Sequence, residues 1–281
     1  MQEIKIDDIQ ISNKLPFILI GGINVLENYA LTYDSALHIK EVCKKISIPF
    51  IFKASYDKAN RSSIYSYRGP GIDKGISIFK KLKEELDIKI ITDVHSVEEV
   101  NKIKDYVDII QLPAFLARQT DLIHAIAKTN CVVNIKKPQF ISPMQVKNIA
   151  QKFYEFGNEK LLICERGTNF GYDNLIVDML SFGVIKKQCK NIPLIFDVTH
   201  SLQFREPSRS TSSGRRSQAL ELAKAGISIG IAGLFLECYP NPENAPCDGP
   251  SALPLNKLED FLYQIKEIDD LVKRQQNITI N

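Results

Sequence analysis

Short runs of apolar, β-branched or aromatic residues recur along the chain and alternate with longer amphipathic segments. Such a run is typical of a strand in a parallel sheet that is covered by helices on both faces. The runs are 17–20, 50–53, 90–93, 109–112, 132–136, 161–165, 194–198 and 227–236. Eight strands that alternate with helices in a chain of 281 residues predict an α/β fold, the (β/α)8 TIM barrel, whose usual length is about 250 residues.

The segments between the runs carry helical periodicity. Apolar residues recur at helical spacing across 72–86 and 255–268, and Ser142 with Pro143 provides the cap and the first-turn proline of another helix. The segment 4–11 alternates apolar and polar residues, so we expect a short N-terminal β-hairpin that caps the bottom of the barrel. No linker rich in Pro, Gly or Ser divides the sequence, and we expect residues 1–281 to form a single TIM-barrel domain.

The composition excludes several classes of protein. Lys and Arg number 36 against 33 Asp and Glu, and no basic stripe is present, so nucleic acid is not an expected partner. The six cysteines contain no Cys-x-x-Cys pair, and the N-terminus lacks the apolar core of a signal peptide. The longest apolar stretch, 227–236, is far shorter than the roughly 20 residues of a membrane span. We expect a cytoplasmic protein with no membrane partner.

Polar or ionisable residues follow nearly every run. The active site of a TIM barrel lies at the C-terminal ends of its strands. The residues at or just after those ends are Asn24, Lys53, Asp93, Gln111, Lys136, Arg166, His200 and Glu237. With Lys58 and Arg61 added, several cations would share one mouth, which is costly unless anions bind there. We therefore expect two anionic substrates that carry phosphates or carboxylates.

Two other features have a functional and a structural interpretation. His95 and His200 follow strands and are expected in the site, whereas His38 and His124 lie in predicted helices and are expected to be structural. The stretch 204–216, rich in Ser and Arg, is too long for a simple turn between a strand and a helix. It is either a mobile active-site loop or a surface loop without a role, and the sequence does not fix its conformation.

Several long motifs match a known enzyme family. They are Lys-Ala-Ser-Tyr-Asp-Lys-Ala-Asn-Arg-Ser-Ser at 53–63, Gln-Leu-Pro-Ala-Phe-Leu-Ala-Arg-Gln-Thr at 111–120, Lys-Lys-Pro-Gln at 136–139, Phe-Asp-Val-Thr-His-Ser at 196–201 and Cys-Asp-Gly-Pro at 247–250. Over nearly the whole chain, these motifs resemble the 3-deoxy-D-manno-octulosonate 8-phosphate synthases. The resemblance implies an enzyme that condenses phosphoenolpyruvate with D-arabinose 5-phosphate and water for lipopolysaccharide (Kdo) biosynthesis.

The resemblance also implies roles by position. The anionic groups of phosphoenolpyruvate would be held by Lys53, Lys58, Lys136 and Arg166, with Gln111 and the backbone near Ala114. Arabinose 5-phosphate would be held by Asn60, Arg61 and Ser62, and by Arg118 reaching in from a neighbouring subunit of a homotetramer. Asn24 and Asp93 would contact the sugar and the reacting centre. The reacting carbons would be surrounded by His200, Glu237 and Asp248, and which of these is the base stays open.

The resemblance implies one of two classes within the family. In the metal-dependent class, a Cys, a His, a Glu and an Asp bind one divalent ion. This chain has His200, Glu237 and Asp248 at three of these positions, but Asn24 stands at the position of the Cys. A neutral amide is a much weaker ligand than a thiolate. We therefore expect the metal-independent class, with no metal and no cofactor.

Two alternative functions stay open. One is 3-deoxy-D-arabino-heptulosonate 7-phosphate synthase, which uses the same donor with a four-carbon aldose phosphate, although the motif at 58–63 resembles the site for the five-carbon acceptor. The other is a non-catalytic barrel that only binds sugar phosphates, which would have lost residues of the mouth. No position of the mouth that we can identify has been lost.

Overall fold

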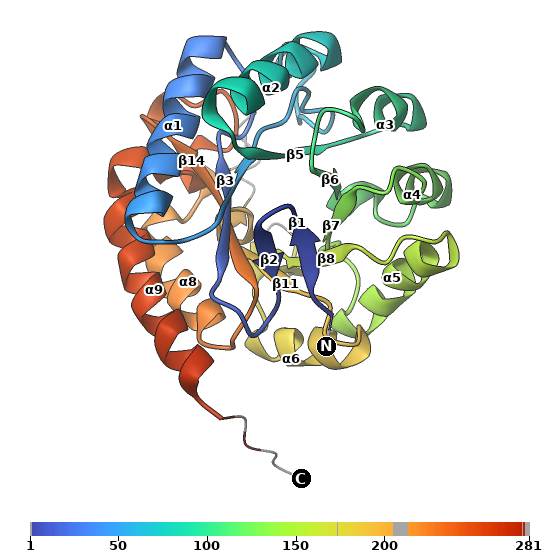
Figure 1. Ribbon diagram of the computed structural model, residues 1–281, viewed down its shortest axis with the longest axis vertical. Helices are drawn as coiled ribbons and strands as arrows, with labels where there is room; N and C mark the ends of the chain where they lie inside the picture. Colours follow the sequence, from blue (N-terminus) through green and yellow to red (C-terminus); the bar gives the residue numbers. More distant parts are fainter. Residues whose placement is uncertain (1, 173, 205–212, 277, 279–281) are drawn as a thin grey trace.

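A closed barrel of parallel strands forms the centre of the protein (Figure 1). The computed structural model describes residues 2–172, 174–204, 213–276 and 278. The eight barrel strands are β3 (Ile18–Gly22), β4 (Phe50–Lys53), β5 (Lys89–Asp93), β6 (Ile109–Leu112), β7 (Val132–Lys136), β8 (Leu161–Glu165), β11 (Leu194–Asp197) and β14 (Gly233–Tyr239). The ring closes because β11 pairs with both β8 and β14. The predicted TIM barrel is confirmed.

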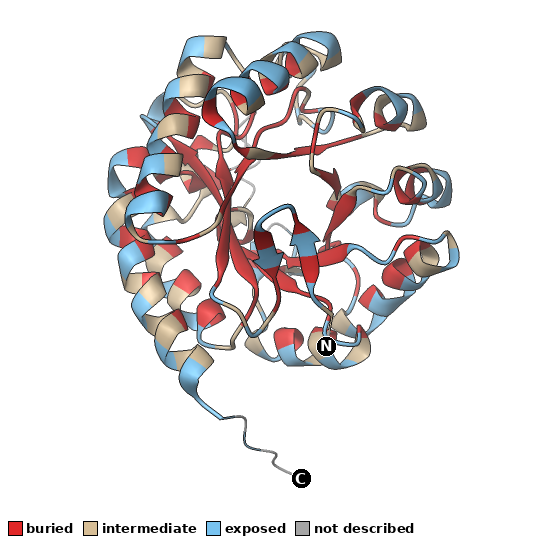
Figure 2. Cartoon of the chain, viewed as in Figure 1, coloured by how far each residue is buried: buried red, intermediate tan, exposed pale blue. Residues whose placement is uncertain are grey.

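Helices surround this barrel and turn their buried faces toward it (Figure 2). They are α1 (Tyr29–Lys45), α2 (Ile72–Leu86), α3 (Val97–Ile103), α4 (Thr120–Ala127), α5 (Val146–Glu155), α6 (Met179–Gln188), α8 (Ala219–Ile227) and α9 (Leu258–Arg274). The periodicity at 72–86 lies in α2, and that at 255–268 lies in the 3-10 turn Leu255–Lys257 and the first part of α9. Ser142 and Pro143 begin a 3-10 turn, Pro143–Gln145, that leads into α5.

The strands separate two layers of core because successive side chains of a strand point to opposite faces. Ile18 and Ile20 of β3 face the barrel interior, whereas Leu19 between them packs in the layer beneath the helices. The N-terminal hairpin of β1 (Ile4–Ile6) and β2 (Ile9–Ile11) adds four buried isoleucines to the interior layer. Figure 1 shows this hairpin across the near end of the barrel, so the predicted cap is confirmed.

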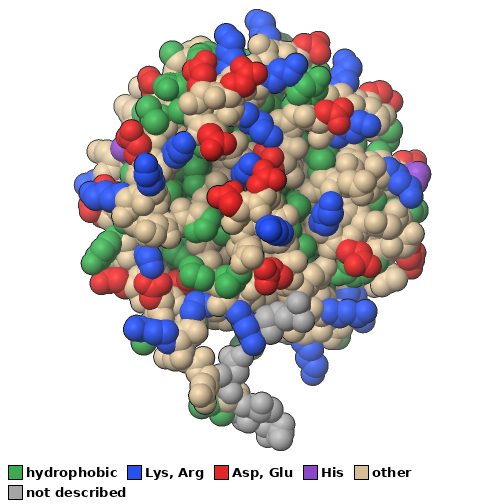
Figure 3. Space-filling model, in the orientation of Figure 1, with side chains coloured by type: hydrophobic (Ala, Val, Ile, Leu, Met, Phe, Trp, Pro, Cys, Tyr) green, Lys and Arg blue, Asp and Glu red, His purple; other side chains and the backbone are tan. Residues whose placement is uncertain are grey.

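The face that carries the hairpin holds cations and anions side by side (Figure 3). Neither charge gathers there into a single patch. None of the helices in the described ranges is both long and apolar enough for a membrane crossing. All six cysteines are free, without a disulfide.

The runs 17–20 and 90–93 differ from β3 and β5 by one or two residues at their ends, and two other predicted strands are wrong for physical reasons. The run 227–236 is not one strand: Ile227 is the last residue of α8, a turn follows in which Gly230 has a φ of 69°, and β14 begins at Gly233. The predicted strand 194–198 is one residue too long, since β11 ends at Asp197. The Asp197 side chain accepts a hydrogen bond from the His200 backbone N–H and so caps the short helix α7 (Val198–Ser201). Both runs are mainly apolar, and a mainly apolar run alone does not distinguish a strand from a buried helix end.

A small antiparallel sheet at the C-terminal side of the barrel was not predicted. Its strands are β9 (Thr168–Phe170), β10 (Asn174–Ile176), β12 (Gln203–Phe204) and β13 (Ser213–Gly214). It joins the loops after β8 and β11. Residues 205–212 of the Ser/Arg-rich stretch lie outside the described residues. Two arginines that follow them tie loops together, since Arg215 donates to the Leu175 carbonyl at 2.8 Å and Arg216 to the Gly249 carbonyl at 2.6 Å.

Candidate active site

The C-terminal ends of the barrel strands open into two adjoining cavities. The inner one, of about 350 Å³, is lined among others by Lys53, Asp93, Gln111, Ala114, Lys136, Asp197 and Glu237. The outer one, of about 290 Å³, is lined among others by Arg61, Ser62, Asn169, Gln203 and Asp248. Both cavities share Lys58, Asn60, Phe115, Gln139, Arg166 and His200. The shared lining makes one chamber of the two cavities, and nearly all of the predicted site residues meet in it.

The cations of the chamber are deeply buried. Lys53, Lys58, Lys136 and Arg166 are each at most 8% exposed. Burial lowers the pKa of Lys53 and of Arg166. Arg166 donates from Nη2 to Gln203 Oε1 at 3.2 Å, but its buried Nη1 has no hydrogen-bond partner among the described residues. Because an unsatisfied buried donor is costly, this arrangement favours an anionic ligand.

Lys137 and Glu165 fix the backbone turn that carries Arg166. Lys137 is fully buried and donates to the Gly167 carbonyl at 2.9 Å, and its Nζ lies 3.3 Å from Glu165 Oε1. Glu165 in turn accepts from the backbone N–H of Arg166 and of Gly167, the latter at 2.7 Å. Gly167 has a φ of 85°, which favours glycine at this turn. A weak signal for this pair lies in the sequence, since Lys137 and Glu165 are next to the two predicted site residues Lys136 and Arg166.

Asp197 joins two of the predicted site residues, although it was not predicted itself. Its carboxylate is fully buried, accepts a hydrogen bond from Lys136 Nζ and lies 2.8 Å from His200 Nδ1. Burial raises the pKa of Asp197, but His200 and Lys136 outweigh burial and hold the pKa far below its ordinary value. Lys136 Nζ also lies 3.2 Å from the centre of the Phe235 ring. Asp197 therefore fixes the position of Lys136 and directs the other ring nitrogen of His200 into the chamber.

Glu237 stands opposite that nitrogen. The two atoms, His200 Nε2 and Glu237 Oε1, are 4.0 Å apart, and Asp248 Oδ2 lies 3.9 Å from the same nitrogen. Both carboxylate oxygens of Glu237 are buried and have no hydrogen-bond partner in the described part of the chain. Burial raises the pKa of Glu237. This carboxyl can therefore hold a proton inside the chamber and exchange it with a ligand.

Asn24 follows β3 by two residues and lines neither cavity, but it bonds to Asp248, which lines the outer one. Its Nδ2 donates to Asp248 Oδ2 at 2.5 Å, and the Cys247 carbonyl lies 3.5 Å away. Asn24 Oδ1 is buried and has no hydrogen-bond partner among the described residues. An N–H group, not a ligand lone pair, thus faces the Asp248 carboxylate. This donor set fits a divalent ion poorly, because a transition-metal site needs lone pairs from all its ligands.

The residues predicted for the sugar phosphate lie at the outer cavity, with one exception. Asn60, Arg61 and Ser62 line it, and Arg61 donates from Nη2 to the Pro246 carbonyl at 3.0 Å. Arg118 is exposed and lines neither cavity of its own chain. It follows the 3-10 turn Ala114–Leu116, in which Phe115 exposes 51% of its surface. One chain alone therefore does not bring Arg118 into the chamber.

Sequence comparisons place this chamber in a known family. The sequence model of the DAHP synthetase I family matches residues 1–274. The 2-dehydro-3-deoxyphosphooctonate aldolase of Parasynechococcus marenigrum (strain WH8102) is 61% identical over 280 residues, which cover 100% of this chain and 99% of the relative. That of Cronobacter sakazakii (strain ATCC BAA-894) is 62% identical over 270 residues, 96% of this chain and 95% of the relative. That of Vibrio parahaemolyticus serotype O3:K6 (strain RIMD 2210633) is 59% identical over 277 residues, 99% of this chain and 98% of the relative. The likeness therefore extends over the barrel and all the loops of the chamber, and the chain belongs to the DAHP synthetase I family, beside its 2-dehydro-3-deoxyphosphooctonate aldolases.

Proposed function

We propose that the protein is a 3-deoxy-D-manno-octulosonate 8-phosphate synthase, an enzyme also called 2-dehydro-3-deoxyphosphooctonate aldolase. It condenses phosphoenolpyruvate with D-arabinose 5-phosphate and water, releases phosphate and serves Kdo biosynthesis for lipopolysaccharide. The observation that carries this function is the identity of about 60% with enzymes of that name over their full length. The broader relationship to the DAHP synthetase I family makes the four-carbon acceptor the second candidate.

Phosphoenolpyruvate binds in the inner cavity. Its phosphate and carboxylate are met by buried cations that end strands, Lys53, Lys136 and Arg166, with Lys58 beside them. Gln111 and the backbone at Ala114 line the same cavity. A trianionic ligand balances this positive charge and satisfies the buried Nη1 of Arg166, which supports the assignment.

Arabinose 5-phosphate enters through the outer cavity, where Asn60, Arg61 and Ser62 hold its phosphate. Its aldehyde then points inward to the methylene carbon of the donor. Asp93, which ends β5, and Asn24, two residues after β3, face this junction. The acceptor therefore lies nearer the solvent, and the donor lies deeper.

The chemistry needs two proton movements. The methylene carbon bonds to the aldehyde carbon, whose oxygen takes up a proton. Water adds to the neighbouring carbon and loses a proton, and phosphate leaves as the C–O bond breaks. Glu237, with its raised pKa, and His200 Nε2 flank this place, and Asp248 completes the group. Lys136 stabilises the negative charge that the departing phosphate takes up.

The enzyme works without a metal, as a homotetramer in the cytoplasm. The amide of Asn24 directs an N–H at Asp248, which supports the metal-free class. The exposed apolar side chains of Phe115, Met144 and Leu180 support subunit contacts at the chamber side of the barrel. Arg118 of one subunit then reaches the sugar phosphate bound to its neighbour. Six free cysteines are in keeping with a reducing compartment.

The test is a phosphate-release assay on the purified protein with each substrate alone and with both together. We expect release only with both substrates, and no loss of rate after exhaustive chelation. Release from phosphoenolpyruvate alone would contradict the condensation. Binding of both substrates without turnover would favour the non-catalytic barrel.

A further inference from the structure

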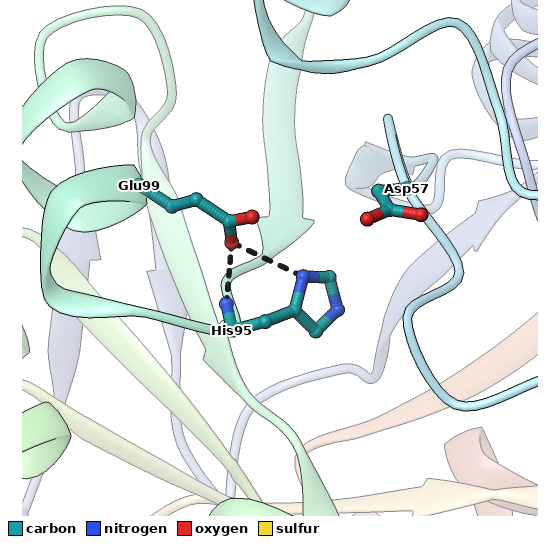
Figure 4. Close-up of side chains that lie close together, drawn as sticks. All are labelled: Asp57, His95 and Glu99. Carbon is teal, nitrogen blue, oxygen red and sulfur yellow. Dashed lines mark hydrogen bonds and ion pairs between the residues drawn. The ribbon is translucent and has the colours of Figure 1, made fainter.

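A cluster of three titratable side chains lies at the rim of the inner cavity. Asp57 belongs to the loop after β4, His95 follows β5, and Glu99 lies in α3. Their potential ligand atoms lie within 4.8 Å of one another, and within the described ranges no other group of three or more does so. Figure 4 shows the imidazole of His95 between the two carboxylates, with bonds to Glu99. His95 also lines the inner cavity.

The carboxylates of this cluster already have hydrogen-bond donors, so it is not a cation site. Arg68 donates to both oxygens of Asp57, from Nε at 2.8 Å. Glu99 Oε2 accepts from the His95 backbone N–H at 2.6 Å and from the Tyr56 hydroxyl at 2.8 Å. A metal ion would have to displace these donors. The cluster instead forms a network of hydrogen bonds that leads to the substrate chamber.

The network of hydrogen bonds continues through Asp93 to Lys53, the lysine proposed to bind phosphoenolpyruvate. His95 Nδ1 lies 3.1 Å from Glu99 Oε2, and His95 Nε2 lies 3.3 Å from Asp93 Oδ2. The other oxygen of Asp93 accepts from Lys53 Nζ at 3.1 Å and from the Ser55 hydroxyl. A chain of alternating charge thus runs from Lys53 through Asp93 and His95 to Glu99.

We propose that His95 is a positioning residue, which holds Asp93 through Nε2–H while Glu99 fixes its ring. This inference rests on the proposed function, in which Lys53 and Asp93 meet the substrates. A carboxylate shared between His95 and Lys53 binds the ammonium less tightly than one paired with Lys53 alone. The ammonium of Lys53 is therefore available to bind the anionic groups of phosphoenolpyruvate, while Asp93 stays oriented toward arabinose 5-phosphate.

The charges that face His95 support this role. Burial lowers its pKa, but hydrogen bonds to Asp93 and Glu99 outweigh burial and raise the pKa to about 9. Asp57 and the ring of Tyr56 face the imidazole from the loop after β4, and Lys53 and Lys58 carry positive charge near Asp93. His95 is therefore an imidazolium at neutral pH, so both ring nitrogens donate. Its contribution to stability is full below its unfolded pKa of about 6.5 and is lost as the pH rises through about 9.

Two substitutions separate positioning from mere packing. In His95→Gln the amide nitrogen replaces Nε2 and can still donate to Asp93, whereas in His95→Asn it replaces only Nδ1. One lost bond to a charged group slows a reaction by about tenfold to a hundredfold. We expect a loss of that size in kcat/KM for arabinose 5-phosphate in His95→Asn, and a loss below about fivefold in His95→Gln. Equal losses in the two folded variants would overturn the inference.

The dependence on pH gives a second readout. We expect the wild-type rate to fall as the pH rises through about 9. We expect this alkaline limb of the pH–rate profile to be missing in His95→Gln, because the amide does not titrate. If the alkaline limb persists unchanged in His95→Gln, it comes from another group, such as Lys53, and the inference is contradicted.

A nitrogen NMR titration of His95 in the substrate-free protein needs no turnover. We expect a pKa near 9 in the wild type and a lower pKa in Glu99→Gln and in Asp93→Asn. A wild-type protein that fails to release phosphate would sink the proposed function, and the NMR titration would still decide about His95. An ordinary pKa, or one that neither variant lowers, would overturn the network.

Discussion

Asp197→Asn is the sharpest perturbation of the chamber, because it removes one charge and no volume. Asp197 is fully buried at the end of β11 and holds both Lys136 and His200. A hydrogen bond to a charged group contributes about 1.5–3 kcal/mol, so weakening both raises the barrier by about 3–6 kcal/mol. Since 1.4 kcal/mol is about a factor of ten, we expect kcat to fall by about 10² to 10⁴.

The same substitution leaves the buried ammonium of Lys136 without its carboxylate. Breaking one side of a buried pair costs about 3–5 kcal/mol, and we expect the free energy of unfolding to fall by that amount. The assay is kcat at saturating substrates, measured on the fraction that stays folded in a thermal melt. Separate measurement of phosphoenolpyruvate binding shows whether the donor still enters the chamber.

Asp178→Asn is the matched control. Asp178 also caps a helix, with its Oδ1 accepting from the Leu180 backbone N–H at 2.9 Å, but it is exposed and holds no cation of the chamber. Because Asn is as good a cap as Asp, we expect normal kcat and a change in stability below about 1 kcal/mol. A folded Asp197→Asn protein with a kcat within about threefold of the wild type would refute the reasoning, since no orienting bond of that size would have been lost.

Three further predictions concern single parts of the site. Lys136→Ala should lower the rate at least about a hundredfold in a folded protein, because it removes a group that stabilises developing charge, and near-normal turnover would exclude Lys136 from the site. Mixed tetramers of inactive Arg61→Ala and inactive Arg118→Ala subunits should regain activity, because some chambers then combine both intact arginines; a mixture that forms and stays inactive would contradict the role of Arg118 between subunits. Asn24→Cys should bind a divalent metal measurably in a titration, because the thiolate adds a strong ligand. The wild type should keep its activity when chelation has removed all metal; wild-type activity that is lost with the metal and returns with manganese, zinc or iron would show a metal-dependent enzyme.

The barrel was predictable because each strand carries its own local signal. The runs 50–53, 109–112, 132–136 and 161–165 coincide with β4, β6, β7 and β8. The run 227–236 failed because the end of α8 and the start of β14 are equally apolar. The sheet of β9, β10, β12 and β13 was missed because its strands are two or three residues long and largely polar.

The chamber was predictable where residues end strands, and less so where they act on one another. Lys53, Asp93 and Lys136 could be placed together because parallel strands of a closed barrel end at one rim. Asp197 on β11 bonds Lys136 on β7, two strands away in the barrel. This bond depends on side-chain geometry across the barrel, which no spacing in the sequence reveals. The same holds for His95, whose contact with Glu99 depends on how α3 leaves β5.

The most direct test of the account compares two acceptors. The kcat/KM for arabinose 5-phosphate and for a four-carbon aldose phosphate is measured on the same preparation with saturating phosphoenolpyruvate. We predict a preference for arabinose 5-phosphate of at least about a hundredfold, because a site that hydrogen-bonds a hydroxyl of its substrate rejects a sugar that leaves those buried polar groups without partners. An equal or greater kcat/KM with the four-carbon sugar would contradict it and would make the protein a 3-deoxy-D-arabino-heptulosonate 7-phosphate synthase.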